Sequence, residues 1–137
     1  MNHLVVLDAQ ARELEKILSG VKTMLVKEFD AAHPVSPGDS LYFLREKGDC
    51  ELRVQAAVVR VLFLTSNLEP DLSQPLKELQ FKLQFTEHQF DYWSVKKQIL
   101  LVEFDSARKM DVIQVAPAKT ADRSDWIAFA DLTLITA

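Results

Sequence analysis

Two lysines, Lys22 and Lys27, follow Gly20 closely and are the first candidates for chemistry in this chain. A lysine amine acts as a nucleophile or a base only when it is unprotonated. Removal from water, or a neighbouring cation such as Lys16 or Lys27, would lower the pKa of Lys22 toward that state. Most lysines are solvated, so the residues by themselves predict an exposed Lys22 at the start of a strand.

Other kinds of reactive or metal-binding motif are missing from the sequence. The three histidines, His3, His33 and His88, lie far apart and have no partner at helical spacing, so they give no support to a metal site. The single cysteine, Cys50, excludes a Cys-rich zinc site and an intrachain disulfide framework. The sequence also has no glycine-rich phosphate loop and no serine nucleophile elbow. We expect neither a metal nor a cofactor.

Aromatic side chains form the second group of candidates, because nucleobases stack on them. The group comprises Tyr42, Phe43, Phe90, Tyr92, Trp93 and Trp126. Asp91 stands among three of these aromatic residues, and a carboxylate there would suit the hydrogen-bonding edge of a base. We therefore expect Tyr92 and Trp93 in a ligand site. The structural alternative for this segment is a short helix packed on the sheet.

The elements that position the lysines are predicted from local patterns. An apolar run at 4–7 predicts a strand, and Asp8 is a suitable N-cap for a helix over 9–19. Gly20 ends that helix, because glycine enters the left-handed conformation without steric cost. A strand over 22–29 follows directly, so the lysines lie at a helix-to-strand join.

The remaining elements complete an α+β pattern. Further strands are predicted over 40–45, 51–64, 98–105 and 109–115, and helices over 76–83 and 86–93. Within the longest strand, Arg53 and Gln55 share one face while Arg60 falls on the other. This change of face predicts a bulge or a strong bend, as in a sheet that curls into a barrel. We expect about five or six strands and two or three helices.

Composition limits the classes of protein that the chain can represent. With 137 residues, 48% hydrophobic and 26% charged, the sequence predicts one globular domain over 1–137. A net charge of −4 argues against a broad, non-specific grip on a polyanion, although a local basic pocket is compatible with it. The first residues lack a signal-peptide pattern and a membrane span, so we expect a cytoplasmic protein with no membrane partner.

The stretch 20–27, Gly-Val-Lys-Thr-Met-Leu-Val-Lys, resembles the signature of the ASCH family of small PUA-like β-barrels, Gly-x-Lys-x-x-Glu-x-Arg. Gly20 and Lys22 match this pattern and Lys27 stands in for the arginine. Leu25 occupies the acidic position. The resemblance implies a small PUA-like β-barrel.

Similarity in order and spacing extends over about three quarters of the chain. It includes the helix up to Gly20, the turn at 37–41 and the strands at 54–64 and 99–104. The tail, 111–137, goes beyond the shortest family members and is expected to be an extension that is not typical of the family.

The resemblance implies a cleft, lined by the helix-to-strand join, that is suited to RNA or to a modified nucleoside. Together with the aromatic segment, it gives six expected ligand-binding residues: Gly20, Lys22, Thr23, Lys27, Tyr92 and Trp93. Binding of RNA or a nucleoside-type small molecule is the first functional hypothesis. A regulatory or interaction domain that has lost its ligand is another.

An amidohydrolase is the hypothesis from a different class. Some small family members hydrolyse N4-acetylcytidine with a lysine, a hydroxyl residue and a carboxylate, and Lys22 matches the lysine. The hydroxyl position falls on Leu25, although Thr23 lies nearby on the predicted strand. The resemblance places the carboxylate before the middle helix, at Glu69 or Asp71. The implied catalytic set is therefore Lys22 with one of these two residues.

Overall fold

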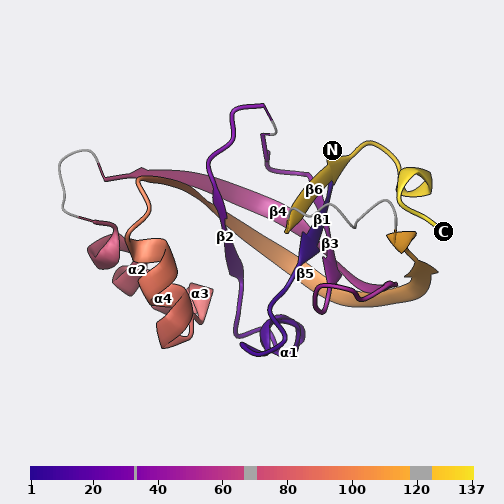
Figure 1. The fold of residues 1–137 in the computed structure, drawn as a ribbon, viewed down its shortest axis with the longest axis horizontal. Coiled ribbons are helices and arrows are strands. Elements are labelled where there is room, and N and C mark those ends of the chain that lie inside the picture. The colour runs from indigo at the N-terminus through magenta and orange to yellow at the C-terminus, as the bar shows by residue number, and fades with distance from the viewer. Residues whose placement is uncertain (33, 67–70, 118–124) are drawn as a thin grey trace.

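The computed structural model describes residues 1–32, 34–66, 71–117 and 125–137. They form one six-stranded sheet with the strand order β2-β5-β4-β3-β1-β6 (Figure 1). The strands are β1 (Asn2–Val6), β2 (Met24–Glu28), β3 (Ser40–Leu44), β4 (Glu51–Thr65), β5 (Gln98–Gln114) and β6 (Trp126–Phe129). Only the β1–β3 pair is parallel among these strands, and the sheet has β2 and β6 at its two edges.

Four α-helices occur in the described residues, rather than the two or three expected. They are α1 (Glu13–Leu18), α2 (Ser73–Glu78), α3 (Gln80–Leu83) and α4 (Glu87–Ser94), and a 3-10 helix, η1, covers Leu132–Leu134. The helix predicted over 76–83 is divided at Leu79, whose φ of −103° and ψ of 7° are not helical. In these ranges no helix has the length and apolar character needed to cross a membrane.

The first helix is also shorter than predicted. Arg12 has a φ of 56°, which is left-handed, so regular helix begins only at Glu13. The predicted N-cap, Asp8, instead accepts hydrogen bonds from the backbone amides of Gln10 and Ala11, at 2.9 and 3.3 Å, within the turns that precede the helix.

The predicted bend in the sheet lies in the pairing of β4 with β5. Register shifts occur at three places along this pair, and one of them adds Val59 between the paired residues Val58 and Arg60. This extra residue explains why the polar side chains of β4 change faces. Ser106, with a φ of 57°, lies opposite another shift, so the two strands predicted over 98–115 are one strand with a bulge. The sheet consequently curls into an α+β half-barrel.

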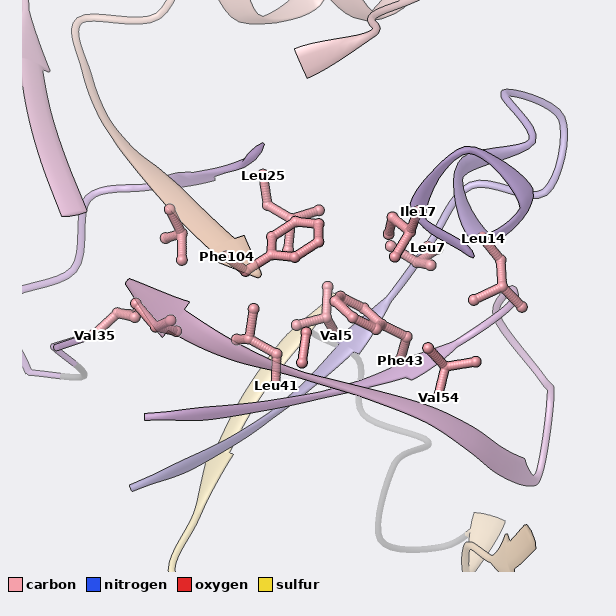
Figure 2. Close-up of a cluster of buried hydrophobic side chains, with 13 residues drawn as sticks. Val5, Leu7, Leu14, Ile17, Leu25, Val35, Leu41, Phe43, Val54 and Phe104 are labelled. Carbon is pink, nitrogen blue, oxygen red and sulfur yellow. The ribbon is translucent and has the colours of Figure 1, made fainter. Parts of the chain in front are cut away.

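One hydrophobic core fills the inside of this curl. Figure 2 shows Leu25 of β2 and Phe104 of β5 pointing toward Val5 of β1 and Phe43 of β3. Ile17 of α1, only 1% exposed, packs into the same cluster. Helix α1 is thereby anchored to the inner face of the sheet, next to the point where β2 begins.

The opposite face of the sheet carries two further cores. Met24 of β2 faces away from Leu25, because side chains alternate along a strand, and it packs with Leu76 and Leu83 of helices α2 and α3. Leu4 of β1 packs with Phe129 of β6. The tail that was expected to be an extension thus supplies an edge strand, since β6 pairs with β1.

The predicted helix-to-strand join is present. After α1 the backbone amides of Val21 and Lys22 both donate to the carbonyl oxygen of Lys16, each at 3.1 Å, and Gly20 has a φ of 83°. These bonds satisfy a carbonyl left free at the helix end. The join therefore fixes the direction in which β2, and the Lys22 side chain just before it, leave the helix.

Replacing Gly20 tests the backbone requirement separately from packing, because a Cβ added there would meet no atom within 4 Å. We expect Gly20→Ala to lower the free energy of unfolding by about 1–2 kcal/mol, the cost of a left-handed alanine. Gly20→Asn should lose clearly less, since asparagine tolerates this conformation. Urea denaturation of both variants measures the difference. Equal losses would show that conformation at Gly20 is not the cause.

Candidate functional site

A cleft of about 1140 Å³ lies between the two edges of the half-barrel. Its lining comes from β1, β2 and β6, from the exposed face of α4, and from Glu13 of α1. Lys27 of β2 and Trp126 of β6 meet across it, with Nζ 5.7 Å from the ring centroid. The cleft thus occupies the gap that the incomplete closure of the barrel leaves.

Lys22 lies at the base of this cleft with only 1% of its surface exposed. Its Nζ donates a hydrogen bond to the carbonyl oxygen of Leu83, lies 3.4 Å from Oε2 of Glu13, and is 5.4 Å from the ring centroid of Phe85. The expectation of an exposed lysine is therefore wrong. Its covering residues come from a segment about 60 positions further along the chain, which local pattern does not predict.

Burial is the largest influence on the pKa of Lys22 and lowers it, because the charged form loses its hydration. The carboxylate of Glu13 opposes this shift, and the charge of Lys16 adds to it. Glu13 is itself held in place, since its Oε1 accepts a hydrogen bond from the backbone amide of Asp8 at 2.8 Å. Lys22 and Glu13 thus form a close ion pair at the base of the cleft, in which the lysine is fully buried and the glutamate partly so.

Lys27 is half-buried on the wall formed by β2. Its Nζ donates to the carbonyl oxygen of Glu28 at 3.2 Å and lies over the ring of Trp126. Burial lowers the pKa of Lys27, against the raising effect of the carboxylates of Asp30 and Glu28. Lys27 is thus the cleft cation that a ligand reaches more easily than Lys22.

Helix α4 forms the aromatic wall. Its start is fixed by Thr86, whose side chain accepts from the Gln89 amide while the Gln89 side chain accepts from the Thr86 amide. Tyr92 and Trp93 both line the cleft, their rings meeting edge to face, and Tyr92 is 50% exposed. His88 on the same face is also exposed and lines the cleft.

The wall opposite α4 comes from the tail of the chain. Asp125 and Trp126 line it, and the indole Nε1 of Trp126 donates to Nδ1 of His3 at 3.1 Å. The sequence marked Trp126 only as one aromatic candidate among six. Its position beside β2 depends on the pairing of β6 with β1, which joins residues more than 120 positions apart.

The lining carries more negative than positive charge. Its carboxylates are Asp8, Glu13, Glu28, Asp30 and Asp125, whereas its lysines are Lys22 and Lys27. Glu13 was not expected as a site residue, because helical periodicity places it only on the polar side of α1. Its acidic type at the first turn of that helix was the one signal in the sequence.

Gly20 and Thr23, although expected in the ligand site, lie outside the cleft lining. Gly20 shapes the turn before Lys22. The backbone of Thr23 connects α3 to β5, because its amide donates to Lys82 and its carbonyl accepts from Phe104, both at 3.0 Å. Leu25 does line the cleft, but its side chain is packed in the inner core and is 4% exposed.

Of the two carboxylates predicted to assist Lys22, the structure describes only Asp71. Asp71 is not part of the cleft lining, and its Oδ1 accepts from the backbone amide of Ser73 at 2.9 Å, at the start of α2. Glu69 lies outside the described residues. The carboxylate beside Lys22 is that of Glu13.

Metal coordination has no candidate in the part of the chain that the structure describes. No group of three or more histidine, cysteine, aspartate or glutamate side chains there is arranged to hold an ion. The polar and aromatic side chains that line the cleft offer amines, carboxylates, an imidazole, an amide and aromatic rings.

The buried Lys22 amine should be important for stability. We expect Lys22→Met to lower the free energy of unfolding by about 1–3 kcal/mol, because the Leu83 carbonyl and the Glu13 carboxylate lose their donor. Lys27→Met is the matched control, and its more accessible amine should cost about 1 kcal/mol or less. Urea denaturation at neutral pH compares them, and equal losses would contradict the structural role of the Lys22 amine.

No family model matches the chain, and no curated protein matches its sequence. Solved structures do resemble it. The crystal structure of ASCH from Zymomonas mobilis has a TM-score of 0.69 at 11% identity, covering 97% of this chain and 90% of that one. A mutant of that protein with a tyrosine replaced by phenylalanine gives 0.69 at 10% identity, with 94% and 90% covered. A second mutant, with a serine replaced by alanine, gives 0.68 at 11%, with 94% and 88% covered. The likeness in backbone, over nearly the whole length of both chains, shows that this protein has an ASCH-like, PUA-like fold.

Proposed function

We propose that the cleft binds a nucleoside-type small molecule. The observation that carries this proposal is the combination of aromatic walls with a mostly acidic lining. Five aromatic residues contribute: Phe29, Phe85, Tyr92, Trp93 and Trp126. Concave sites with several aromatic side chains and a few polar groups are typical of small-molecule pockets, and stacking on aromatic rings is typical of nucleobase recognition.

The charge of the cleft favours a nucleoside over an RNA strand. An RNA backbone requires several accessible lysines or arginines along its path. Of the two lysines in the lining, Lys22 is buried against Glu13, so only Lys27 is readily available to a phosphate. A neutral base and sugar avoid the repulsion that the five carboxylates would exert on phosphates.

The remaining open volume argues against a domain that has lost its ligand. Leu25 and Trp126 lie on the walls, yet the cleft keeps about 1140 Å³, slightly more than the range of about 300–1,000 Å³ that is usual for small-molecule sites. The lining also keeps polar groups that have no need to be there for packing, such as the exposed His88.

Tyr92 offers a direct test of binding, because it is half-exposed and its replacement should leave the core intact. We expect Tyr92→Ala to weaken binding of the best ligand among cytidine, N4-acetylcytidine, uridine, adenosine and guanosine by about 1–3 kcal/mol. Calorimetry measures the affinity. Phe81→Ala is the matched control, since Phe81 is 65% exposed on the neighbouring α3 and outside the cleft lining.

Lys27→Ala extends this test to the β2 wall, and it should also weaken binding. A short single-stranded RNA, titrated at two salt concentrations, serves as the competing ligand. Tight RNA binding with a steep salt dependence, and no nucleoside binding, would contradict the proposed ligand class. Parental affinity in both the Tyr92 and the Lys27 variants would contradict the assignment of the cleft.

A second candidate is amidohydrolysis of an acylated nucleobase, and the Lys22–Glu13 pair is the observation that favours it. The lowered pKa of Lys22 increases the fraction of unprotonated amine, and Glu13 lies close enough to exchange its proton. In this mechanism Glu13 takes the role first assigned to Glu69 or Asp71. The amine must leave its contact with Leu83 to reach a substrate carbonyl.

N4-acetylcytidine tests this candidate, since water must cleave its amide bond to give cytidine and acetate. We expect turnover to increase with pH as Lys22 loses its proton, and to do so below the usual lysine pKa of about 10.4. Lys22→Met and Glu13→Gln should each abolish or strongly reduce it, as followed by chromatography of cytidine. The absence of turnover at high enzyme concentration, with nucleoside binding intact, would leave binding as the function.

A further inference from the structure

A buried histidine of β1, His3, connects Trp126 in the cleft wall to Asp39, which lies on the other side of its ring. His3 is completely buried, and its Nε2 lies 2.8 Å from Oδ2 of Asp39, just before β3. Asp39 also accepts from the Ser36 amide at 3.0 Å, and its Oδ1 lies 3.3 Å from the ammonium group of Met1. On the other side of the ring, Nδ1 of His3 meets the indole of Trp126 at 3.1 Å.

The partners determine which nitrogen of His3 carries the proton. An indole N–H is a donor only, so Nδ1 must be an unprotonated acceptor. A carboxylate is an acceptor, so Nε2 must carry the proton and donate it to Asp39. Both contacts are satisfied only by the neutral Nε2–H tautomer of His3.

We propose that His3 and Asp39 are positioning residues that hold Trp126 as a wall of the cleft while His3 is neutral, so that ligand binding weakens when His3 is protonated. This inference rests on the proposed function of the cleft. It deepens that function by giving it a pH dependence that arises outside the lining, because neither His3 nor Asp39 lines the cleft.

Protonation of His3 would place an N–H on Nδ1, facing the N–H of Trp126. Two donors cannot share this contact, so one of the rings must move. Trp126 belongs to β6, a four-residue edge strand that pairs with β1 alone among the described strands, whereas His3 is enclosed between β3 and β6. The indole is therefore the ring that is freer to leave.

The charged groups around His3 act in opposite directions. Burial is the largest influence and lowers the pKa of His3, while the hydrogen bond and the charge of Asp39 raise it. The ammonium group of Met1 and the side chain of Lys27, which reaches over Trp126 from β2, lower it further. Asp125, next to Trp126 in the chain, is a further charged residue of the cleft lining.

The sign of the pH effect follows from this balance. The native state binds the His3 proton less readily than the unfolded chain does, so the contribution of neutral His3 is complete above the unfolded pKa of about 6.5. As pH falls below that value, stability decreases. At lower pH still, once native His3 takes up its proton, the contact with Trp126 is lost.

The first experiment observes the two rings directly and requires no ligand. In the Trp93→Phe protein, the only indole N–H signal belongs to Trp126. We expect nitrogen NMR at pH 7.5 to show His3 protonated on Nε2 and not on Nδ1. As pH is lowered stepwise, the indole signal should shift in step with the appearance of a proton on Nδ1 of His3. In His3→Gln, whose amide can accept from the indole and donate to Asp39, the indole signal should stay in place over the same pH range.

His88→Gln is the matched control, since it removes the exposed histidine of the cleft, and there the indole signal should still shift. An Nδ1–H tautomer of His3 at pH 7.5 would overturn the proposal. So would an indole signal that stays in place while Nδ1 of His3 becomes protonated, one that shifts equally in His3→Gln, or a His3 that stays neutral until the protein unfolds.

The second experiment couples this change to binding. For the nucleoside that binds best at pH 7.5, we expect the dissociation constant to increase about two- to tenfold at the pH at which the NMR titration shows His3 protonated on both nitrogens, the range of one lost hydrogen bond. The constant should change much less in His3→Gln. A shifting indole signal with an unchanged dissociation constant would overturn the coupling. If none of the nucleosides binds at pH 7.5, the proposed function fails, and the NMR result still decides whether His3 positions Trp126.

Discussion

The bulged pairing of β4 with β5 is the constraint on which the other features depend. These two strands are the longest in the sheet, and three register shifts along them bend it. Without that curl, β2 and β6 would lie at opposite ends of a flat six-stranded sheet, about 20 Å or more apart at the usual spacing between strands. With it, Lys27 and Trp126 face each other across one cleft. The curl also encloses the inner core that holds α1, and so places Glu13 beside Lys22.

The structural contacts of Lys22 and its proposed role as a reacting amine make opposite demands on this side chain. The contacts that bury its amine, with Leu83, Glu13 and Phe85, connect α1, the start of β2 and the loop before α4. The same contacts occupy the N–H donors of the Lys22 amine, and a reacting amine would have to leave these contacts. A nucleophilic lysine benefits from burial, because its pKa falls, but it must remain within reach of its substrate. In this structure the burial of Lys22 favours a low pKa, but the same burial limits the reach of its amine to a substrate.

Local features were predictable because their causes lie within a few residues. The positive φ of Gly20, the capping of α4 by Thr86 and the bulge before Arg60 each leave a pattern in the nearby sequence. Boundaries that depend on one unusual backbone angle, as at Arg12 and Ser106, were missed, since neither residue type favours a left-handed conformation. The resemblance of residues 20–27 to the ASCH signature, together with these signals, was enough to predict the α+β curled sheet.

The composition of the site was much harder to predict, because it depends on contacts between distant segments. Glu13 meets Lys22 only through the turn at Gly20, and Phe85 covers Lys22 only after α3 has packed on β2. Asp71 looked plausible beside the middle helix, yet its carboxylate is used at the start of that helix. Residue type gave the chemistry that was available, but tertiary packing decided which residues meet.

The pairing of β1 with β6 has a consequence for the order in which the protein is assembled. It joins Asn2 to Phe129, so one wall of the cleft is made from the first and the last of the described strands. Contacts of such long sequence separation form slowly, because a large loop must close before they contribute any stability. During synthesis, β1 can pair with β3 while β6 is still missing. The chain then has much of its sheet but lacks the wall that carries Trp126, so the cleft is completed only when β6 pairs with β1.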